Sequence, residues 1–82
     1  MAARRVELYM QPGCGDCFAA EQFLKARGVA FTEYDIRADE KARRRLVDDL
    51  GSRVTATLVI DGEVLRGFGA NRQRAEELLV QG

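Results

Sequence analysis

Apolar and polar residues follow two periods along this chain, one typical of strands and one typical of helices. Residues 6–10 alternate as in a β-strand, and residues 18–27 are rich in helix-forming residues and end at Gly28. Residues 29–36 combine apolar and β-forming residues, which indicates a second strand. Because strand, helix and strand follow one another over about 30 residues, we expect two parallel strands joined by a right-handed crossover.

The next segment, residues 40–50, has the apolar stripe of an amphipathic helix. We expect Asp39 to cap its start and Gly51 to end it. Three consecutive arginines in this helix have acidic neighbours, so we expect a solvated face with the ion pairs Glu40–Arg44 and Arg45–Asp49. The alternative is a docking surface for acidic proteins, which the balanced charge nearby makes less favourable.

A hairpin and a last helix complete the pattern. In residues 57–66 an Asp-Gly pair separates two β-branched runs, which is a strong hairpin signal. Residues 72–80 predict a short helix, with Asn71 as its cap. The order β-α-β-α-β-β-α predicts an α/β protein, a single domain over residues 1–82, with a four-stranded mixed sheet flanked by helices.

The composition narrows the classes of function. Lys+Arg and Asp+Glu number 13 each, so no overall field favours nucleic acid or an anionic membrane. No apolar run approaches the roughly 20 residues that a membrane span needs. Residues 1–5 precede a strand pattern, not the apolar segment of a signal peptide. We therefore expect a cytoplasmic protein that binds neither nucleic acid nor membranes.

The two cysteines of the chain lie three residues apart, in the turn between the first strand and helix, with the sequence PGCGDC over residues 12–17. We expect them at the first turn of the helix, where unpaired backbone N–H groups and the helix dipole stabilise a thiolate. This placement makes Cys14 nucleophilic near neutral pH and puts Cys17 within its reach on the same helix face. The pattern indicates a reversible dithiol–disulfide centre.

Two other interpretations of the cysteines are a buried structural pair and one half of a zinc site. Zinc normally takes four ligands, and this chain supplies two thiols and no histidine. The absence of histidine also removes Cys–His catalysis. Redox chemistry without a metal or organic cofactor is therefore the favoured interpretation.

Three sequence marks carry a resemblance to a known family: Pro12-x-Cys14-x-x-Cys17, the hairpin entry TATLVIDG over residues 55–62, and Gly67-Phe68-Gly69. With the predicted strand order, they resemble the thioredoxin fold in its minimal glutaredoxin form, over nearly the whole chain. The resemblance implies that Cys14 attacks a substrate disulfide and that Cys17 resolves the mixed disulfide.

The residues between the cysteines, Gly15 and Asp16, occupy positions that tune the thiolate in such proteins. Gly15 leaves its backbone N–H open beside the sulfur of Cys14. The carboxylate of Asp16 suits the helix dipole, but a negative charge near a thiolate disfavours ionisation of the thiol. We therefore expect Asp16 to make Cys14 a milder nucleophile at neutral pH.

Ala56 stands where proteins of this family usually have a cis-proline beside the sulfurs. A cis bond costs about 2.5–4 kcal/mol before a non-proline residue, against roughly 0.5–1 kcal/mol before proline. We therefore expect the Thr55–Ala56 bond to be trans, with a locally rearranged loop. We also expect weaker pairing of Thr55 with an extended substrate and more space at the sulfurs.

Two further departures concern glutathione. Gln11 stands where glutathione-using members resemble one another in a basic residue, and the Gly67-Phe68-Gly69 segment replaces the paired glycines that hold the far end of glutathione. In both respects the chain looks more like small redoxins that thioredoxin reductase reduces and that serve ribonucleotide reductase. The side chain of Phe68 either plugs the sheet edge or contacts the substrate.

The resemblance implies a monomeric thiol–disulfide oxidoreductase that reduces protein disulfides, with thioredoxin reductase or glutathione as its reductant. Its catalytic residues would be Cys14 and Cys17. The alternative is a carrier of an iron–sulfur cluster or other thiophilic metal shared across a dimer, which Gly15 and Ala56 would accommodate. A redox-inactive binding module is a third possibility, against which the intact cysteine pair argues. The substrate-binding residues implied by the resemblance are Gln11, Gly15, Asp16, Thr55, Ala56, Gly67 and Phe68.

Overall fold

A computed structural model of the protein describes residues 5–80. The expected absence of a signal peptide falls on residues 1–5, of which residues 1–4 lie outside the described part. Within residues 5–80, no helix is long and apolar enough to cross a membrane.

A four-stranded mixed sheet forms the centre of the molecule, as the sequence predicts. Its strands are β1 (Val6–Met10), β2 (Thr32–Asp35), β3 (Thr57–Ile60) and β4 (Glu63–Arg66), arranged in the order β2-β1-β3-β4. β1 pairs in parallel with β2 and antiparallel with β3, and β3 and β4 form an antiparallel hairpin. The parallel pair confirms the predicted βαβ unit.

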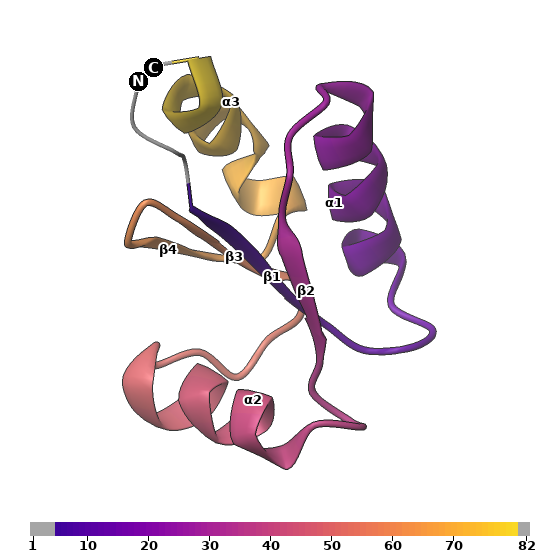
Figure 1. Cartoon of the computed structure of the whole chain (residues 1–82), viewed down its shortest axis with the longest axis vertical. Coiled ribbons are helices and arrows are strands. Elements are labelled where there is room, and N and C mark those ends of the chain that lie inside the picture. Colours follow the sequence, from indigo (N-terminus) through magenta and orange to yellow (C-terminus); the bar gives the residue numbers. More distant parts are fainter. Residues whose placement is uncertain (1–4, 81–82) are drawn as a thin grey trace.

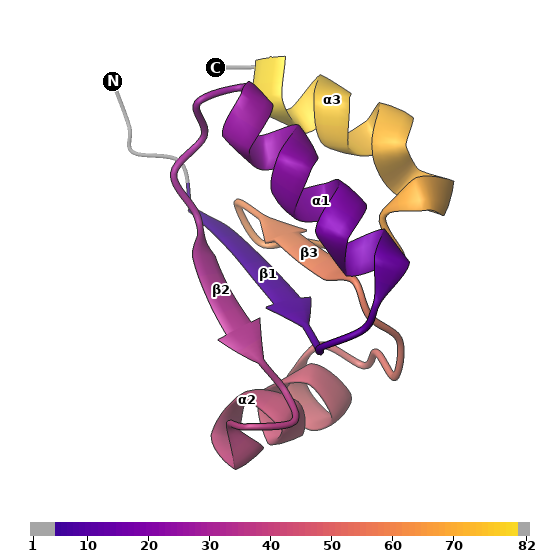
Figure 2. The same ribbon diagram turned by 90° about the vertical axis from the view of Figure 1, so that its right-hand side faces the viewer.

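Helices cover both faces of this sheet (Figures 1 and 2). On one face lie α1 (Gly15–Ala26) and α3 (Arg72–Val80), and on the other lies α2 (Glu40–Arg44), which continues into the π-helical turn η1 (Arg45–Asp49). Successive residues of a strand face opposite sides of a sheet, so the central strands β1 and β3 contribute to both cores. The larger core lies under α1 and α3, and the smaller lies under α2. The larger core includes Leu8, Ala20, Leu24, Leu58, Ile60 and Ala75, and the smaller consists of Tyr9, Ala42, Leu46 and Val59.

The ends of some elements differ from the predicted ones. The second strand begins at Thr32, because residues 29–31 lie before its pairing with β1. The helix predicted over residues 40–50 changes to π-type hydrogen bonding, with Leu50 N–H donating to the Arg45 carbonyl at 2.9 Å. The Asp39 cap is confirmed by a 3.1 Å hydrogen bond from Ala42 N–H.

The predicted cap at Asn71 is wrong. Asn71 belongs to a short 3₁₀ helix, η2 (Gly69–Asn71), which leads directly into α3. Its side-chain amide donates to the carbonyls of Arg66 and Gly67, at 2.8 Å each, and so holds the turn after β4.

The hairpin and the sheet topology bring three loops to one end of the sheet. Asp61 and Gly62 have positive φ values of 49° and 90°, as a type I′ turn requires, which confirms the predicted hairpin. Because β3 runs antiparallel to β1, the start of β3 lies at the carboxyl end of β1. Thr57 pairs with Arg66, so the end of β4 reaches the same place. The candidate site is built from these loops.

Candidate active site

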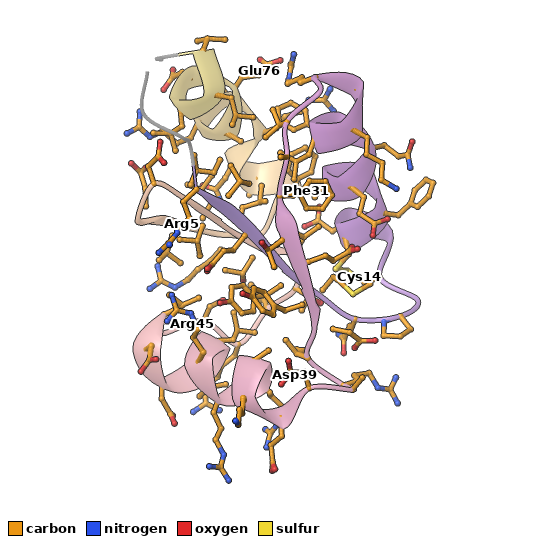
Figure 3. All side chains as sticks on the ribbon, viewed as in Figure 1. Arg5, Cys14, Phe31, Asp39, Arg45 and Glu76 are labelled. Atoms are coloured by element: carbon orange, nitrogen blue, oxygen red, sulfur yellow. A yellow bond between two sulfur atoms is a disulfide. The ribbon has the colours of Figure 1, made fainter. Side chains whose placement is uncertain are left out.

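The two cysteines lie at the N-terminus of α1 and form a disulfide, with their Cα atoms 5.2 Å apart. Cys14 is the N-cap residue, and its sulfur accepts a 3.1 Å hydrogen bond from Cys17 N–H. Cys14 is half-buried, whereas Cys17 is 1% exposed. Figure 3 shows Cys14 at the start of this helix, beside the loop that follows β1. The predicted position of the pair is confirmed, and Cys14 is the sulfur that an incoming group can reach.

A short series of polar contacts leads from the loop after β1 to the sulfur of Cys14. The Gln11 side-chain amide donates to the Thr55 hydroxyl at 3.1 Å, and this hydroxyl donates to Cys14 Sγ at 3.5 Å. A hydroxyl donor and a backbone N–H donor at one sulfur favour its ionised form when the disulfide opens. The sequence placed both side chains near the substrate but did not predict that they contact each other.

The carboxylate of Asp16 binds backbone amides from the two other loops of the site. Oδ2 accepts hydrogen bonds from Phe68 N–H at 2.7 Å and from Ala56 N–H at 3.4 Å, and Oδ1 accepts one from Gly69 N–H at 2.9 Å. A Cβ atom added at Gly69 would lie 3.3 Å from Oδ1, so the backbone approaches this carboxylate closely. The sequence predicted an effect of Asp16 on the thiolate but missed this binding.

The expected trans bond between Thr55 and Ala56 is wrong, because this peptide bond is cis. The local preference of a bond before alanine is trans, but the residues around this bond are held by contacts that the local preference does not include. The Ala56 carbonyl accepts a 2.8 Å hydrogen bond from Gly67 N–H, and the Thr57 hydroxyl donates to the Val54 carbonyl at 2.6 Å. Ala56 is fully buried. The expected extra space at the sulfurs and the weaker pairing of Thr55 with a substrate stay predictions.

The side chain of Phe68 is 2% exposed and lies in the core between α1 and α3. Its ring contacts that of Phe23, with the centroids 5.0 Å apart and the planes 56° apart. This burial supports the interpretation of the side chain as a hydrophobic plug, and its contact with a substrate stays a prediction. Gly67 has a φ of 89°, a conformation that favours glycine, and it turns the backbone so that the following amides face Asp16.

The structure therefore gathers most of the residues that the resemblance implied into one cluster around the disulfide. Gly15 adds open space, since a Cβ atom there would meet nothing within 4 Å. Within residues 5–80, no group of three or more His, Cys, Asp or Glu side chains is placed to hold a metal ion. A role in substrate binding stays a prediction for each of Gln11, Gly15, Asp16, Thr55, Ala56, Gly67 and Phe68.

A thioredoxin-like sheet with a Cys-x-x-Cys pair at the start of its first helix defines a class of redox proteins. The family model for glutaredoxin matches residues 6–65, and the chain belongs to the glutaredoxin family. Comparison with curated protein sequences gave no significant match.

Solved structures agree with this assignment. A mutant of the thioredoxin-like protein BC3987 is 42% identical, with a TM-score of 0.86 and coverage of 96% of each chain. Glutaredoxin 1 from Francisella tularensis, complexed with cacodylate, is 26% identical, with a TM-score of 0.66 and coverage of 94% of this chain and 98% of that one. The glutaredoxin from Archaeoglobus fulgidus is 25% identical, with a TM-score of 0.76 and coverage of 100% and 89%. Family and cysteine pair together support a redox function.

Proposed function

We propose that this chain is a cytoplasmic, monomeric thiol–disulfide oxidoreductase that reduces disulfides of other proteins and takes its electrons from a dithiol reductase of the thioredoxin reductase type. The observation that carries the proposal is the half-buried Cys14 sulfur at the helix N-terminus, bonded to the buried Cys17. Cys17 N–H and the Thr55 hydroxyl both point at the Cys14 sulfur. Together these contacts favour Cys14 as the attacking thiolate.

The reaction proceeds by two exchanges. The Cys14 thiolate attacks one sulfur of the substrate disulfide, that bond breaks, and the departing sulfur takes up a proton. Cys17 then loses its proton and attacks Cys14 Sγ, which releases the second substrate sulfur as a thiolate and forms the Cys14–Cys17 disulfide. Two electrons and two protons from the reductant restore both thiols.

Exposed apolar side chains beside the disulfide favour a protein as the substrate. Phe18, which directly follows Cys17, is 63% exposed, and Val54, which directly precedes Thr55, is 47% exposed. Apolar side chains of this kind gain most when a partner surface covers them. Gly13 and Gly15 on either side of the half-buried Cys14 are exposed, so no bulky side chain next to it in the chain shields its sulfur from a partner. An open surface of this kind fits a macromolecular disulfide.

The choice of reductant rests on the loops around the disulfide. Gln11 places an uncharged amide near Cys14, where a basic residue would attract an acidic thiol such as glutathione. The Gly67-Phe68-Gly69 segment presents a buried aromatic side chain and amides that are already bound. These features support a protein reductant more than glutathione.

Reduction of a model protein disulfide with NADPH and thioredoxin reductase, run in parallel with glutathione and its reductase, tests the proposal. We expect turnover with thioredoxin reductase and little or none with glutathione. Turnover only with glutathione would contradict the proposed reductant. The absence of turnover with both reductants would contradict the proposed activity, provided that the disulfide of the protein is shown to open and close. A brown colour after anaerobic purification would then favour the carrier of an iron–sulfur cluster.

A further inference from the structure

The carboxylate of Asp16 accepts several backbone hydrogen bonds, and the proposed reaction does not use this carboxylate. A carboxylate between two redox cysteines has no proton to transfer in either exchange step, yet it accepts three backbone hydrogen bonds. The donors, Ala56, Phe68 and Gly69, lie 40, 52 and 53 residues further along the chain. Hydrogen bonds to a charged acceptor are stronger than those between neutral groups, so these amides hold the Asp16 carboxylate in one position.

These amides form a binding site for a carboxylate, and the structure shows a carboxylate in it. Two of the donors come from consecutive residues, Phe68 and Gly69, and reach different oxygens of the same group at 2.7 and 2.9 Å. The third donor, Ala56, is available because an alanine has the N–H that proline lacks. The occupant is therefore held by both oxygens, as a free carboxylate would be.

The amides lie next to the reactive sulfur. Ala56 directly follows Thr55, whose hydroxyl contacts Cys14 Sγ at 3.5 Å, and Asp16 itself lies two residues from Cys14. When the sulfur of a small thiol attacks Cys14, the remaining atoms of that molecule must lie over these same loops. If that thiol carries a carboxylate, the amides offer it hydrogen bonds only after Asp16 has left them.

We propose that Asp16 is a specificity-determining residue, whose carboxylate fills this amide site from within the chain and so excludes small acidic thiols such as glutathione as reductants. This inference rests on the proposed thiol–disulfide exchange function. An incoming carboxylate would have to displace Asp16 and would lie beside a like charge, so it meets both competition and repulsion. A neutral thiol or a protein dithiol does not have to displace Asp16 and is not repelled by its charge, so it reacts at Cys14 without this hindrance.

This selectivity can be measured in thiol–disulfide exchange, in which the small thiol is the sole reductant of the Cys14–Cys17 disulfide. The thiolate of the small thiol attacks Cys14 Sγ, the Cys14–Cys17 bond breaks, and Cys17 leaves as a thiolate that takes up a proton. A second molecule of the thiol then attacks the mixed disulfide at the small-thiol sulfur. It releases the Cys14 thiolate and forms the oxidised disulfide of the small thiol.

The test compares the rate constants for opening of the Cys14–Cys17 disulfide by glutathione and by 2-mercaptoethanol, which has no carboxylate. For Asp16→Ala we expect the ratio of the two constants, glutathione over 2-mercaptoethanol, to rise about tenfold, the size expected when one charged group gains its hydrogen bonds. For Asp16→Asn, which removes the charge but keeps an oxygen for the amides, we expect a rise of about threefold. Asp39→Ala, which removes a carboxylate that caps α2, should leave the ratio unchanged.

An unchanged ratio in folded Asp16→Ala or, if that variant does not fold, in folded Asp16→Asn would overturn the proposal. So would equal acceleration of both thiols, because Asp16 would then act only through the reactivity of the sulfurs. The ratio is measured in stoichiometric exchange and needs no protein substrate or reductase. Failure of the proposed protein-disulfide reduction would therefore appear in the turnover assay, separately from failure of this inference.

Discussion

At the scale of single residues, the site depends on which side chains remain exposed beside the disulfide. Phe18 belongs to α1 and follows the buried Cys17, yet its ring is 63% exposed. An aromatic side chain in this position costs solubility unless a partner covers it, and its contact area makes it a suitable anchor for a protein surface.

Phe18→Ser should raise the KM for a protein disulfide about fivefold, which corresponds to roughly 1 kcal/mol of lost apolar contact. The kcat should change little, because the sulfurs and their donors are untouched. Steady-state reduction of a protein disulfide measures both constants. Val80→Ser, which removes another exposed apolar side chain on α3, serves as the control. An unchanged KM for Phe18→Ser would show that this ring does not contact the substrate.

The positions of residues that depend on neighbours in sequence could be predicted from the sequence, and contacts between residues far apart in the chain could not. The positions of Cys14 and Cys17 follow from a turn and a helix start that are both encoded within a few residues. The contact of Asp16 with Phe68 joins residues 52 positions apart, and no local preference indicates it. The cis bond before Ala56 was missed for the same reason, because its neighbours are held by hydrogen bonds to other loops.

At the scale of elements, an acidic side chain of α1, Glu21, lies beside an acidic side chain of β2, Glu33. A side-chain hydrogen bond with Glu21, together with partial burial and the negative charge of Glu21, raises the pKa of Glu33 to about 7, while Lys25 opposes the shift. A hydrogen bond between two carboxyl groups requires a proton on one of them. Protonation of Glu33 therefore favours the folded protein, in which this carboxyl group lies beside Glu21.

This pair should make stability depend on pH. The folded protein binds this proton more tightly than the unfolded chain, whose Glu33 has an ordinary pKa of 4.5, so the free energy of unfolding should fall as the pH rises from about 4.5 through about 7. Glu33→Gln carries a neutral amide at every pH and should flatten this dependence. Urea unfolding of the oxidised protein from pH 5 to 8 measures the slope, with Glu40→Gln on α2 as the control. Equal slopes in the wild type and Glu33→Gln would contradict the account.

The order and type of the elements could be predicted because each has a local signal, such as the Asp39 cap or the Asp61-Gly62 turn. Their ends could not, because these depend on neighbours. β2 begins only where Thr32 meets Glu7 of β1. The helix after Asp39 widens to a π-turn at Arg45, and the end of that turn is bound by a hydrogen bond from Ser52 N–H to the Leu46 carbonyl.

At the scale of the whole molecule, the sheet places three loops from distant parts of the chain at the disulfide. The loop after β1 supplies Gln11 and Cys14, the loop before β3 supplies Thr55, and the turn after β4 supplies the amides that bind Asp16. The mixed sheet predicted from the sequence accounts for this meeting, since the antiparallel β3–β4 hairpin returns to the carboxyl end of β1. The two helices over one face and α2 over the other then support the sheet on both sides (Figure 2).

The central claim, that Cys14 attacks the substrate and Cys17 resolves the product, is tested most directly by trapping the intermediate. Reduced Cys17→Ser is mixed with a protein disulfide, and the intact mass of the products is measured, with reduced Cys14→Ser as the matched variant. We expect a stable mixed disulfide through Cys14 in Cys17→Ser and none in Cys14→Ser, because Cys17 is buried. Adduct formation by Cys14→Ser, or its absence in folded Cys17→Ser, would contradict the assignment.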